Sequence, residues 1–277
     1  YGKLTNFFSS KNFIEKKIKE EKYEKGKSSK LLVFPTTAGS GAEVTSNAVI
    51  YINKVKFSVE SNLLIPDYFR LIPELIITAP KLLKSSSGFD AISQSIESMI
   101  SKKSNNQSLL YASKALKILN ENYINFLKNP KKNNAYNMSL GAHYAGKAIS
   151  ISKTTAPHAL SYPFTSHFSI PHGHAVSLTF NQILTYNYKN VENSNCNFNL
   201  LNRYKKIFRI LGVSNIDEFN IYINKLKKNA GLENNFLKLN INLKKDLNKI
   251  LVGVNNKRLD NNPIKLSREI LKDIITN

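Results

Sequence analysis

The chain has 277 residues, of which 42% are hydrophobic, so it can bury a sizeable core and is not an intrinsically disordered protein. Its net charge of +21 would suit an anionic partner, but the lysines are scattered among many Asn and Ile residues, and these three residue types share AT-rich codons. We therefore attribute the charge to base composition and expect no nucleic-acid partner. A basic nucleic-acid-binding fragment is the alternative from a different class of protein.

The number of cysteines and the hydropathy of the chain indicate the cellular compartment in which the protein is expected. The single cysteine, Cys196, cannot form an internal disulfide. No apolar run approaches the roughly 20 residues that a membrane-spanning helix needs, and the polar N-terminus does not resemble a signal peptide. We therefore expect a cytoplasmic protein without membrane contact.

Residues 1–79 predict an α/β segment. Residues 11–30 are rich in charge and indicate a solvated helix followed by a flexible approach that contains Gly26. Short apolar runs bounded by turn residues then indicate buried strands. The predicted strands lie at residues 31–34, 49–52, 56–59 and 75–77.

Residues 80–277 predict an all-helical part. Apolar residues recur there at spacings of three and four, as at Phe89, Ile92 and Ile96, and strand signals are few. We therefore place a domain boundary near residue 79.

A Gly-rich turn, TTAGSGAE at residues 36–43, directly follows the first predicted strand. Glycines let a backbone approach a phosphate closely, and hydroxyls and backbone N–H groups can donate to it. The pattern alone is weak, because an ordinary turn has the same composition.

The histidines are concentrated in one stretch of the helical part. All five lie within residues 143–174: His143, His158, His167, His172 and His174. Upstream, Asp90 and Gln94 are four residues apart, so they share one helix face. A carboxylate and two imidazoles can form a catalytic metal site, whereas the simpler interpretation of Asp90 is a first-turn carboxylate favoured by the helix dipole.

Four segments in this order resemble the iron-containing (group III) alcohol dehydrogenase family. They are FPTTAGSGAEVTSNAVI (34–50), SSGFDAISQSIES (86–98), HALSYPFTSHFSIPHGHA (158–175) and RLDNNPIKLSREIL (258–271). The resemblance implies the dehydroquinate synthase-like fold of that family, with an α/β dinucleotide-binding domain before an all-α metal-binding domain. The family's front part, with its Gly-Gly-Gly-Ser loop, has no counterpart here. We therefore expect residues 1–79 to be the remnant of a truncated cofactor domain.

The resemblance also implies a metal site for iron or zinc. Asp90, His158 and His172 match the family's metal ligands, and Gln94 stands where the family usually has a fourth ligand, a histidine. An amide oxygen is a weaker donor than imidazole, so a three-ligand, zinc-like site is an equal alternative.

Further roles follow from the same resemblance. Tyr162 occupies the position of a frequent pocket histidine, where it could donate a proton or shape the pocket, and His174 is the other expected catalytic residue. The positions expected to contact NAD or NADP are Thr36, Thr37, Ser40, Asn47 and Lys56.

Within the family, the stretch KTTAPHALSYPFTSHF looks most like the branch that reduces phosphonoacetaldehyde to 2-hydroxyethylphosphonate. A phosphonate needs cations and hydroxyl donors, and Lys153, Thr154 and His167 are the residues expected to supply them. The alternative within the superfamily is a general short-chain alcohol or glycerol dehydrogenase. A homodimer is a family expectation.

Overall fold

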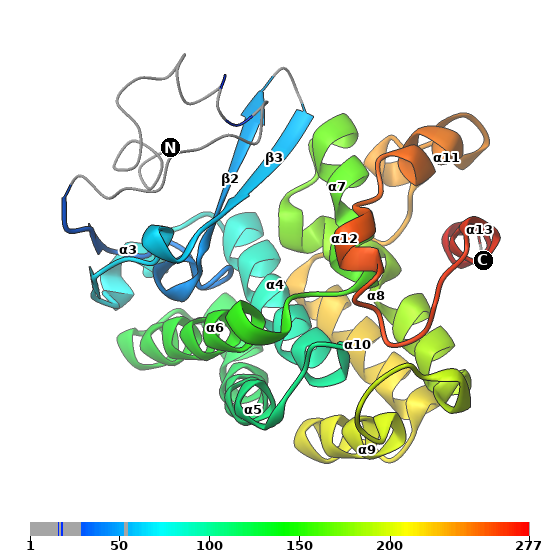
Figure 1. Cartoon of the computed structure of the whole chain (residues 1–277). Coiled ribbons are helices and arrows are strands. Elements are labelled where there is room, and N and C mark those ends of the chain that lie inside the picture. The colour runs from blue at the N-terminus through cyan, green and yellow to red at the C-terminus, as the bar shows by residue number, and fades with distance from the viewer. Residues whose placement is uncertain (1–15, 17, 19–28, 53–54, 277) are drawn as a thin grey trace.

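The computed structural model describes residues 16, 18, 29–52 and 55–276 of the chain. It shows a small α/β part on one side of a larger helical part (Figure 1). No helix among these residues has both the length and the apolar character needed to span a membrane.

The α/β part contains two separate two-stranded sheets. Strand β1 (Leu32–Val33) pairs in parallel with β4 (Tyr68–Phe69), and β2 (Asn47–Ile52) pairs antiparallel with β3 (Val55–Glu60). In the second sheet Asn47 lies opposite Glu60 and Ile52 opposite Val55. The predicted strands at 31–34, 49–52 and 56–59 are therefore confirmed, the first in shortened form, whereas β4 was not predicted.

The predicted strand at 75–77 is wrong, because this segment lies in helix α3 (Pro73–Ile77). Pro73 occupies the first turn, where its fixed φ suits a helix and no N–H is required of it. Glu74, also in the first turn, is favoured by the helix dipole. Three apolar residues in a row resemble a buried strand, but only Ile76 among them is buried.

The predicted helix within residues 11–30 falls almost entirely outside the described residues. The two described positions, Lys16 and Ile18, are helical, and Ile18 is buried against Ile50, Val59 and Leu64 of the β2–β3 region.

The helical part is built around α4 (Lys81–Ile100), which is buried over most of its length. Helices α5, α6 and α8 pack directly against α4, and α7 packs against α8. The helices after α4 are α5 (Asn106–Lys128), α6 (Lys132–Ser152), α7 (Ala156–Phe168), α8 (His172–Lys189), α9 (Leu200–Leu211), α10 (Ile216–Ala230), α11 (Leu243–Val252), α12 (Asn256–Leu259) and α13 (Arg268–Thr276). Short 3₁₀ helices are η1 (Ala42–Val44), η2 (Asn62–Leu64), η3 (Val191–Asn193) and η4 (Leu237–Leu239).

Two apolar cores stabilise this part. The larger core lies between α4, α5, α6, α8, α9 and α10, and its largest fully buried side chains include Phe89, Tyr123 and Tyr204. The smaller core joins α7 and α8 to α11 and α13. Because α4, α7 and α8 are held by these cores, side chains on their facing surfaces have defined positions.

A close contact joins the α/β part to the helical part. Gly41, in the Gly-rich turn, has a φ of 59°, and a Cβ there would lie 2.5 Å from the Cα of Gly146 on α6. Only glycine combines this left-handed conformation with so close an approach. The Gly-rich turn is therefore packed directly against α6.

Candidate metal centre

Helix α4 presents three polar side chains on its buried face. Asp90, Gln94 and Glu97 follow one another at spacings of four and three, which places them on the same side of the helix. All three are buried. Buried carboxylates are costly unless they are paired, so their partners identify the site.

Two histidines face this side of α4. His158 lies in the first turn of α7 and His172 is the first residue of α8. Gly173 lets the start of α8 approach α4: a Cβ at this position would lie 2.0 Å from the carbonyl oxygen of Ser86 and 2.8 Å from the Cβ of Asp90. The glycine thus brings His172 to Asp90.

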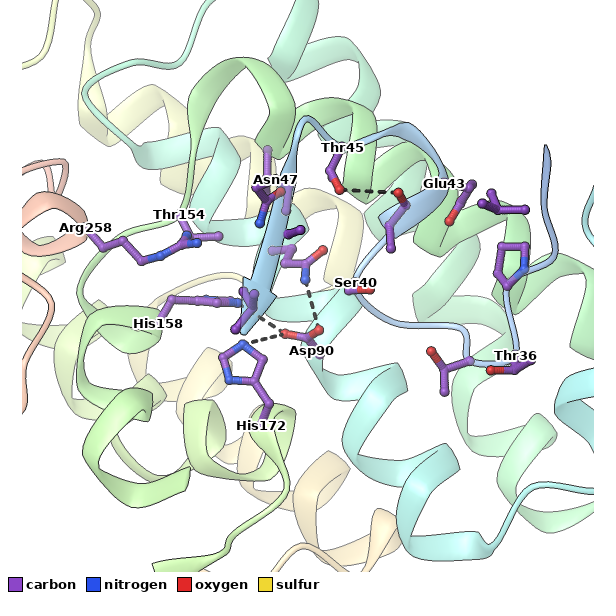
Figure 2. Close-up of a pocket in the computed structure, with 18 of the residues that line it drawn as sticks. Thr36, Ser40, Glu43, Thr45, Asn47, Asp90, Thr154, His158, His172 and Arg258 are labelled. Carbon is purple, nitrogen blue, oxygen red and sulfur yellow. Dashed lines mark hydrogen bonds and ion pairs between the residues drawn. The ribbon is translucent and has the colours of Figure 1, made fainter. Parts of the chain in front are cut away.

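Asp90, His158 and His172 together offer ligand atoms that all lie within 4.8 Å of one another. Asp90 Oδ1 lies 3.2 Å from His158 Nε2 and 3.8 Å from His172 Nε2. Figure 2 shows both imidazoles pointing toward the Asp90 carboxylate. This arrangement could hold a divalent cation.

Glu97 holds His158 from the opposite side of the imidazole ring. Its Oε1 lies 2.6 Å from His158 Nδ1, while its Oε2 accepts hydrogen bonds from Thr155 N at 2.7 Å and Thr155 Oγ1 at 2.8 Å. Thr155 is the N-cap of α7. An Nδ1–H that donates to Glu97 leaves Nε2 directed at Asp90, as a metal ligand requires.

The charges of the cluster are strongly coupled. Burial would raise the pKa of Asp90, but the hydrogen bond with His158 and the nearby charges of His172 and His158 lower it below its ordinary value. Burial would lower the pKa of His158, but the charge of Glu97 and the bonds to Asp90 and Glu97 raise it. The site therefore favours an ionised carboxylate with a positive charge beside it.

Gln94 adds an oxygen without a partner. Its Nε2 donates to Asp90 Oδ2 at 3.0 Å, while its Oε1 is buried and forms no hydrogen bond within the described part of the chain. A buried amide oxygen without a partner is costly. One carboxylate, two imidazoles and this amide oxygen form a donor set that suits zinc or iron.

A cavity of about 630 Å³ opens beside the cluster (Figure 2). It is lined by the four predicted metal-site residues and by residues of the Gly-rich turn and β2. The predicted cofactor positions on its wall are Thr36, Thr37, Ser40 and Asn47, and the other predicted residues on it are Thr154 and Tyr162. Residues on both sides of the boundary predicted near residue 79 thus share one cavity.

Three predicted site residues lie outside the cavity lining, and the side chain of a fourth, Lys56, is not described. Lys56 is on β3, opposite Tyr51, and its side chain is outside the described part of the structure. The other three side chains do not line the cavity. Lys153 pairs with Glu60 on β3, and His167 is exposed at the end of α7.

His174 is buried on α8 but points away from the cavity, with Nε2 2.7 Å from the carbonyl oxygen of Glu233. Burial, and secondarily the charge of Lys227, lower its pKa, against the opposing effect of Glu233. Its position two residues after His172 placed it near the ligands in sequence, but successive helix positions face different directions.

Two residues at the site were not predicted. Glu97 could have been found from its spacing, since it shares the face of Asp90 and Gln94. Arg258 lies in one of the family-like segments, but nothing in its local sequence links it to residues 154–162. Its Nε donates to the Tyr162 hydroxyl at 2.7 Å and its Nη1 donates to the Thr154 hydroxyl.

The carboxylate–imidazole cluster and the Gly-rich turn face one cavity between the α/β part and the all-α part, which is the arrangement expected of a metal-dependent dehydrogenase. The chain belongs to the iron-containing alcohol dehydrogenase family. Residues 84–277 match the model of its C-terminal domain, "Fe-containing alcohol dehydrogenase family, C-terminal", and residues 1–73 match the "Iron-containing alcohol dehydrogenase" model. The fold predicted from the resemblance is thereby confirmed.

Individual relatives share different parts of the chain. A 4-hydroxybutyrate dehydrogenase of Clostridium kluyveri is 32% identical over 59% of this chain and 46% of its own length. A phosphonoacetaldehyde reductase of Streptomyces viridochromogenes is 29% identical over 57% of this chain and 41% of its own length. The chain thus aligns with less than half the length of these two relatives.

The structure of a sulfoacetaldehyde reductase from Bifidobacterium kashiwanohense in complex with NAD+ matches with a TM-score of 0.85 and 26% identity. The match covers 95% of this chain and 68% of that chain. The similarity therefore extends over both the α/β part and the helical part.

Proposed function

We propose that the protein reduces an aldehyde to a primary alcohol with a divalent metal and NADH or NADPH, and that its substrate is phosphonoacetaldehyde, which gives 2-hydroxyethylphosphonate. The observation that carries this proposal is the shared cavity. The Asp90, His158 and His172 cluster and the Gly-rich turn at 36–43 both border it. The metal cluster and the turn predicted to contact the cofactor thus border one cavity, which supports their use in one reaction.

Asp90, His158 and His172 would hold the metal, with Gln94 Oε1 as the fourth donor. When bound, the metal supplies Lewis-acid polarisation of a carbonyl and the reduced nicotinamide supplies hydride. Glu97 keeps His158 Nε2 directed into the site. Tyr162 would shape the cavity wall, and either its hydroxyl or a water molecule would protonate the product oxygen.

Thr36, Thr37, Ser40 and Asn47 would contact the nicotinamide cofactor, because they line the cavity beside the metal cluster. We also propose Lys56 as a cofactor contact, and this assignment rests only on the resemblance of the sequence to the family. The relative of known structure was determined in complex with NAD+, which supports a nicotinamide cofactor for this chain.

The names of the three relatives support an acidic substrate. 4-Hydroxybutyrate, phosphonoacetaldehyde and sulfoacetaldehyde differ in their acidic group, but each carries one at the end of a short chain. Phosphonoacetaldehyde combines this feature with the aldehyde that the proposed reaction needs. A homodimer and a cytoplasmic location stay predictions.

The first test is the metal content of the purified chain beside the double variant Asp90→Ala/His172→Ala. We expect about one zinc or iron per chain, lost in the double variant, because removing two of three strong donors leaves no site.

The second test concerns the substrate. Metal-dependent oxidation of NADH or NADPH is compared for phosphonoacetaldehyde and for propanal, an uncharged aldehyde of similar length.

Equal metal content in the wild-type chain and the double variant would refute the metal site. Turnover of propanal as fast as phosphonoacetaldehyde would refute the phosphonate substrate and favour a general alcohol dehydrogenase.

A further inference from the structure

Arg258 brings a positive charge to the cavity that contains the metal cluster. It lies on the short helix α12 and is partly buried, and its guanidinium extends toward Thr154 (Figure 2). Among the described residues that line this cavity, it is the only lysine or arginine.

The hydrogen-bond partners of Arg258 are neutral. Nε donates to the hydroxyl of Tyr162 and Nη1 to the hydroxyl of Thr154, and the Tyr162 ring centroid lies 5.8 Å from Cζ. Within the described part of the chain, Arg258 forms no ion pair with a carboxylate. Its charge is therefore available to an anion in the cavity, and a guanidinium has five N–H donors, more than these two bonds use.

The surrounding loops hold Arg258 in place. Asn255 caps α12 by accepting a bond from the backbone N–H of Arg258 at 3.0 Å. Asn261, just after α12, donates to the carbonyl oxygens of Ser152 and Thr154, both at 2.9 Å. These bonds join α12 to the segment before α7, so the guanidinium is positioned before any ligand binds.

The position of Arg258 relative to the metal cluster follows from its partners. Thr154 and Tyr162 lie four residues before and four residues after His158, and Tyr162 is one turn along α7 from this ligand. Four residues of helix span about 6 Å along the axis. An anion at Arg258 would therefore lie a few bond lengths from a carbonyl group held beside His158.

We propose that Arg258, supported by Thr154 and Tyr162, binds the acidic end of the substrate while its carbonyl group lies at the metal cluster. This inference rests on the proposed function and deepens it. The ligand class is a short aldehyde or alcohol with a phosphonate, sulfonate or carboxylate group two or three bonds from the carbonyl or hydroxyl carbon. The planar guanidinium can donate two parallel N–H bonds to any of these groups. Arg258 thus replaces Lys153 and His167, which lie outside the cavity lining, as the anion-binding residue.

The test measures binding rather than turnover. Zinc-loaded wild-type chain is titrated with 2-hydroxyethylphosphonate, 2-hydroxyethanesulfonate, 4-hydroxybutyrate and the uncharged control 1-propanol, and binding is followed by calorimetry. We expect the best acidic ligand to bind about tenfold to a hundredfold more tightly than 1-propanol, the range that hydrogen bonds to charged groups provide. Comparison of the three acids identifies which acidic group is preferred.

The same titrations are made with Arg258→Met, Arg258→Lys and Lys257→Met. Arg258→Met should lose the preference for acids, Arg258→Lys should keep part of it, and Lys257→Met, an exposed neighbour on α12, should keep all of it. Zinc affinity should be the same in all of them, which would show that the fold and the metal site persist.

Two outcomes would overturn the assignment of Arg258. One is a zinc-loaded chain that binds 1-propanol as tightly as the acids. The other is a loss of the preference in Lys153→Met but not in Arg258→Met. Absence of zinc binding in the wild-type chain would instead refute the proposed function, so the two failures can be distinguished.

Discussion

Glu97 contacts the candidate metal centre only through Nδ1 of His158 among the described residues. A substitution of Glu97 therefore tests how the orientation of this one ligand affects metal binding. The residue is fully buried, and one of its oxygens is committed to Thr155 and the other to His158. A carboxylate that orients a ligand imidazole also increases the basicity of that imidazole. Glu97 is thus a positioning residue for His158 in the proposed reaction.

We predict that Glu97→Gln weakens zinc binding about tenfold to a hundredfold, because a neutral amide holds the imidazole less strongly than a carboxylate. The measurement is competition with a chelating dye at fixed pH. Glu121→Gln, an exposed residue of α5, is the matched control and should leave the zinc dissociation constant unchanged. The same dissociation constant in Glu97→Gln and wild type would contradict the positioning role.

Lys227 illustrates how a buried charge affects stability apart from the site. It is 2% exposed, its Nζ donates to the carbonyl oxygen of Ser177 at 2.6 Å, and burial lowers its pKa to about 7. The unfolded chain therefore binds more protons than the folded chain between about pH 7 and the ordinary lysine pKa of about 10.4. The contribution of Lys227 to the free energy of unfolding therefore rises as the pH increases across that range.

We predict that the stability of Lys227→Met relative to the wild type falls by on the order of a few kcal/mol as the pH rises from about 7 to about 10, because only the wild type has a buried lysine whose protonation costs stability. Urea unfolding at several pH values measures it. Lys228→Met, the exposed neighbour, should show no such dependence. A stability difference that stays constant with pH would contradict the prediction.

At the scale of elements, the contact between α4 and α8 determines whether the metal ligands meet. Asp90 is on α4 and His172 begins α8, and Gly173 lies directly against the α4 backbone beside Ser86 and Asp90. A methyl group at Gly173 would meet the Ser86 carbonyl oxygen, which is backbone and cannot rotate away. Helix α8 would have to move, and His172 would move with it.

We therefore expect Gly173→Ala to destabilise the fold by about 1–3 kcal/mol and to reduce zinc affinity at least tenfold. Thermal unfolding and zinc competition measure the two effects. In Gly212→Ala, no atom would lie within 4 Å of the new methyl group, but the φ of 73° would be strained. This control should lose about 1 kcal/mol of stability and keep its zinc affinity. Wild-type zinc affinity in Gly173→Ala would show that the close approach is not required.

At the scale of the whole molecule, the net charge of +21 opposes compaction. Ion pairs between exposed side chains, such as Lys132 with Glu74, offset little of this repulsion. Salt screens repulsion between charges that lie farther apart than the Debye length, which shortens from about 30 Å at 0.01 M to about 8 Å at 0.15 M.

Raising sodium chloride from about 0.01 M to about 0.3 M should therefore increase the melting temperature by about 2–5 °C. Differential scanning fluorimetry at constant pH provides the measurement. A melting temperature that falls with salt would mean that attractive pairs outweigh the repulsion between the excess lysines.

The sequence by itself determined the local features of this protein. Apolar runs predicted β2 and β3, the three- and four-residue spacing predicted the helical part, and the ordered motifs predicted the family that the domain models confirm. The motif resemblance also named Asp90, His158 and His172, which the structure brings together. These features could be predicted because they depend on neighbouring residues or on short motifs that keep their spacing.

Tertiary structure alone decided which distant residues share the site. Arg258 reaches Tyr162 across 96 positions of sequence, whereas His174 turns to Glu233 although it is two residues from His172. Local sequence could not exclude a strand at 75–77 either, because three apolar residues suit a strand or a helix equally well. The physical reason is common to these cases: helix packing sets the direction and neighbours of each side chain, and these contacts join segments far apart in the chain.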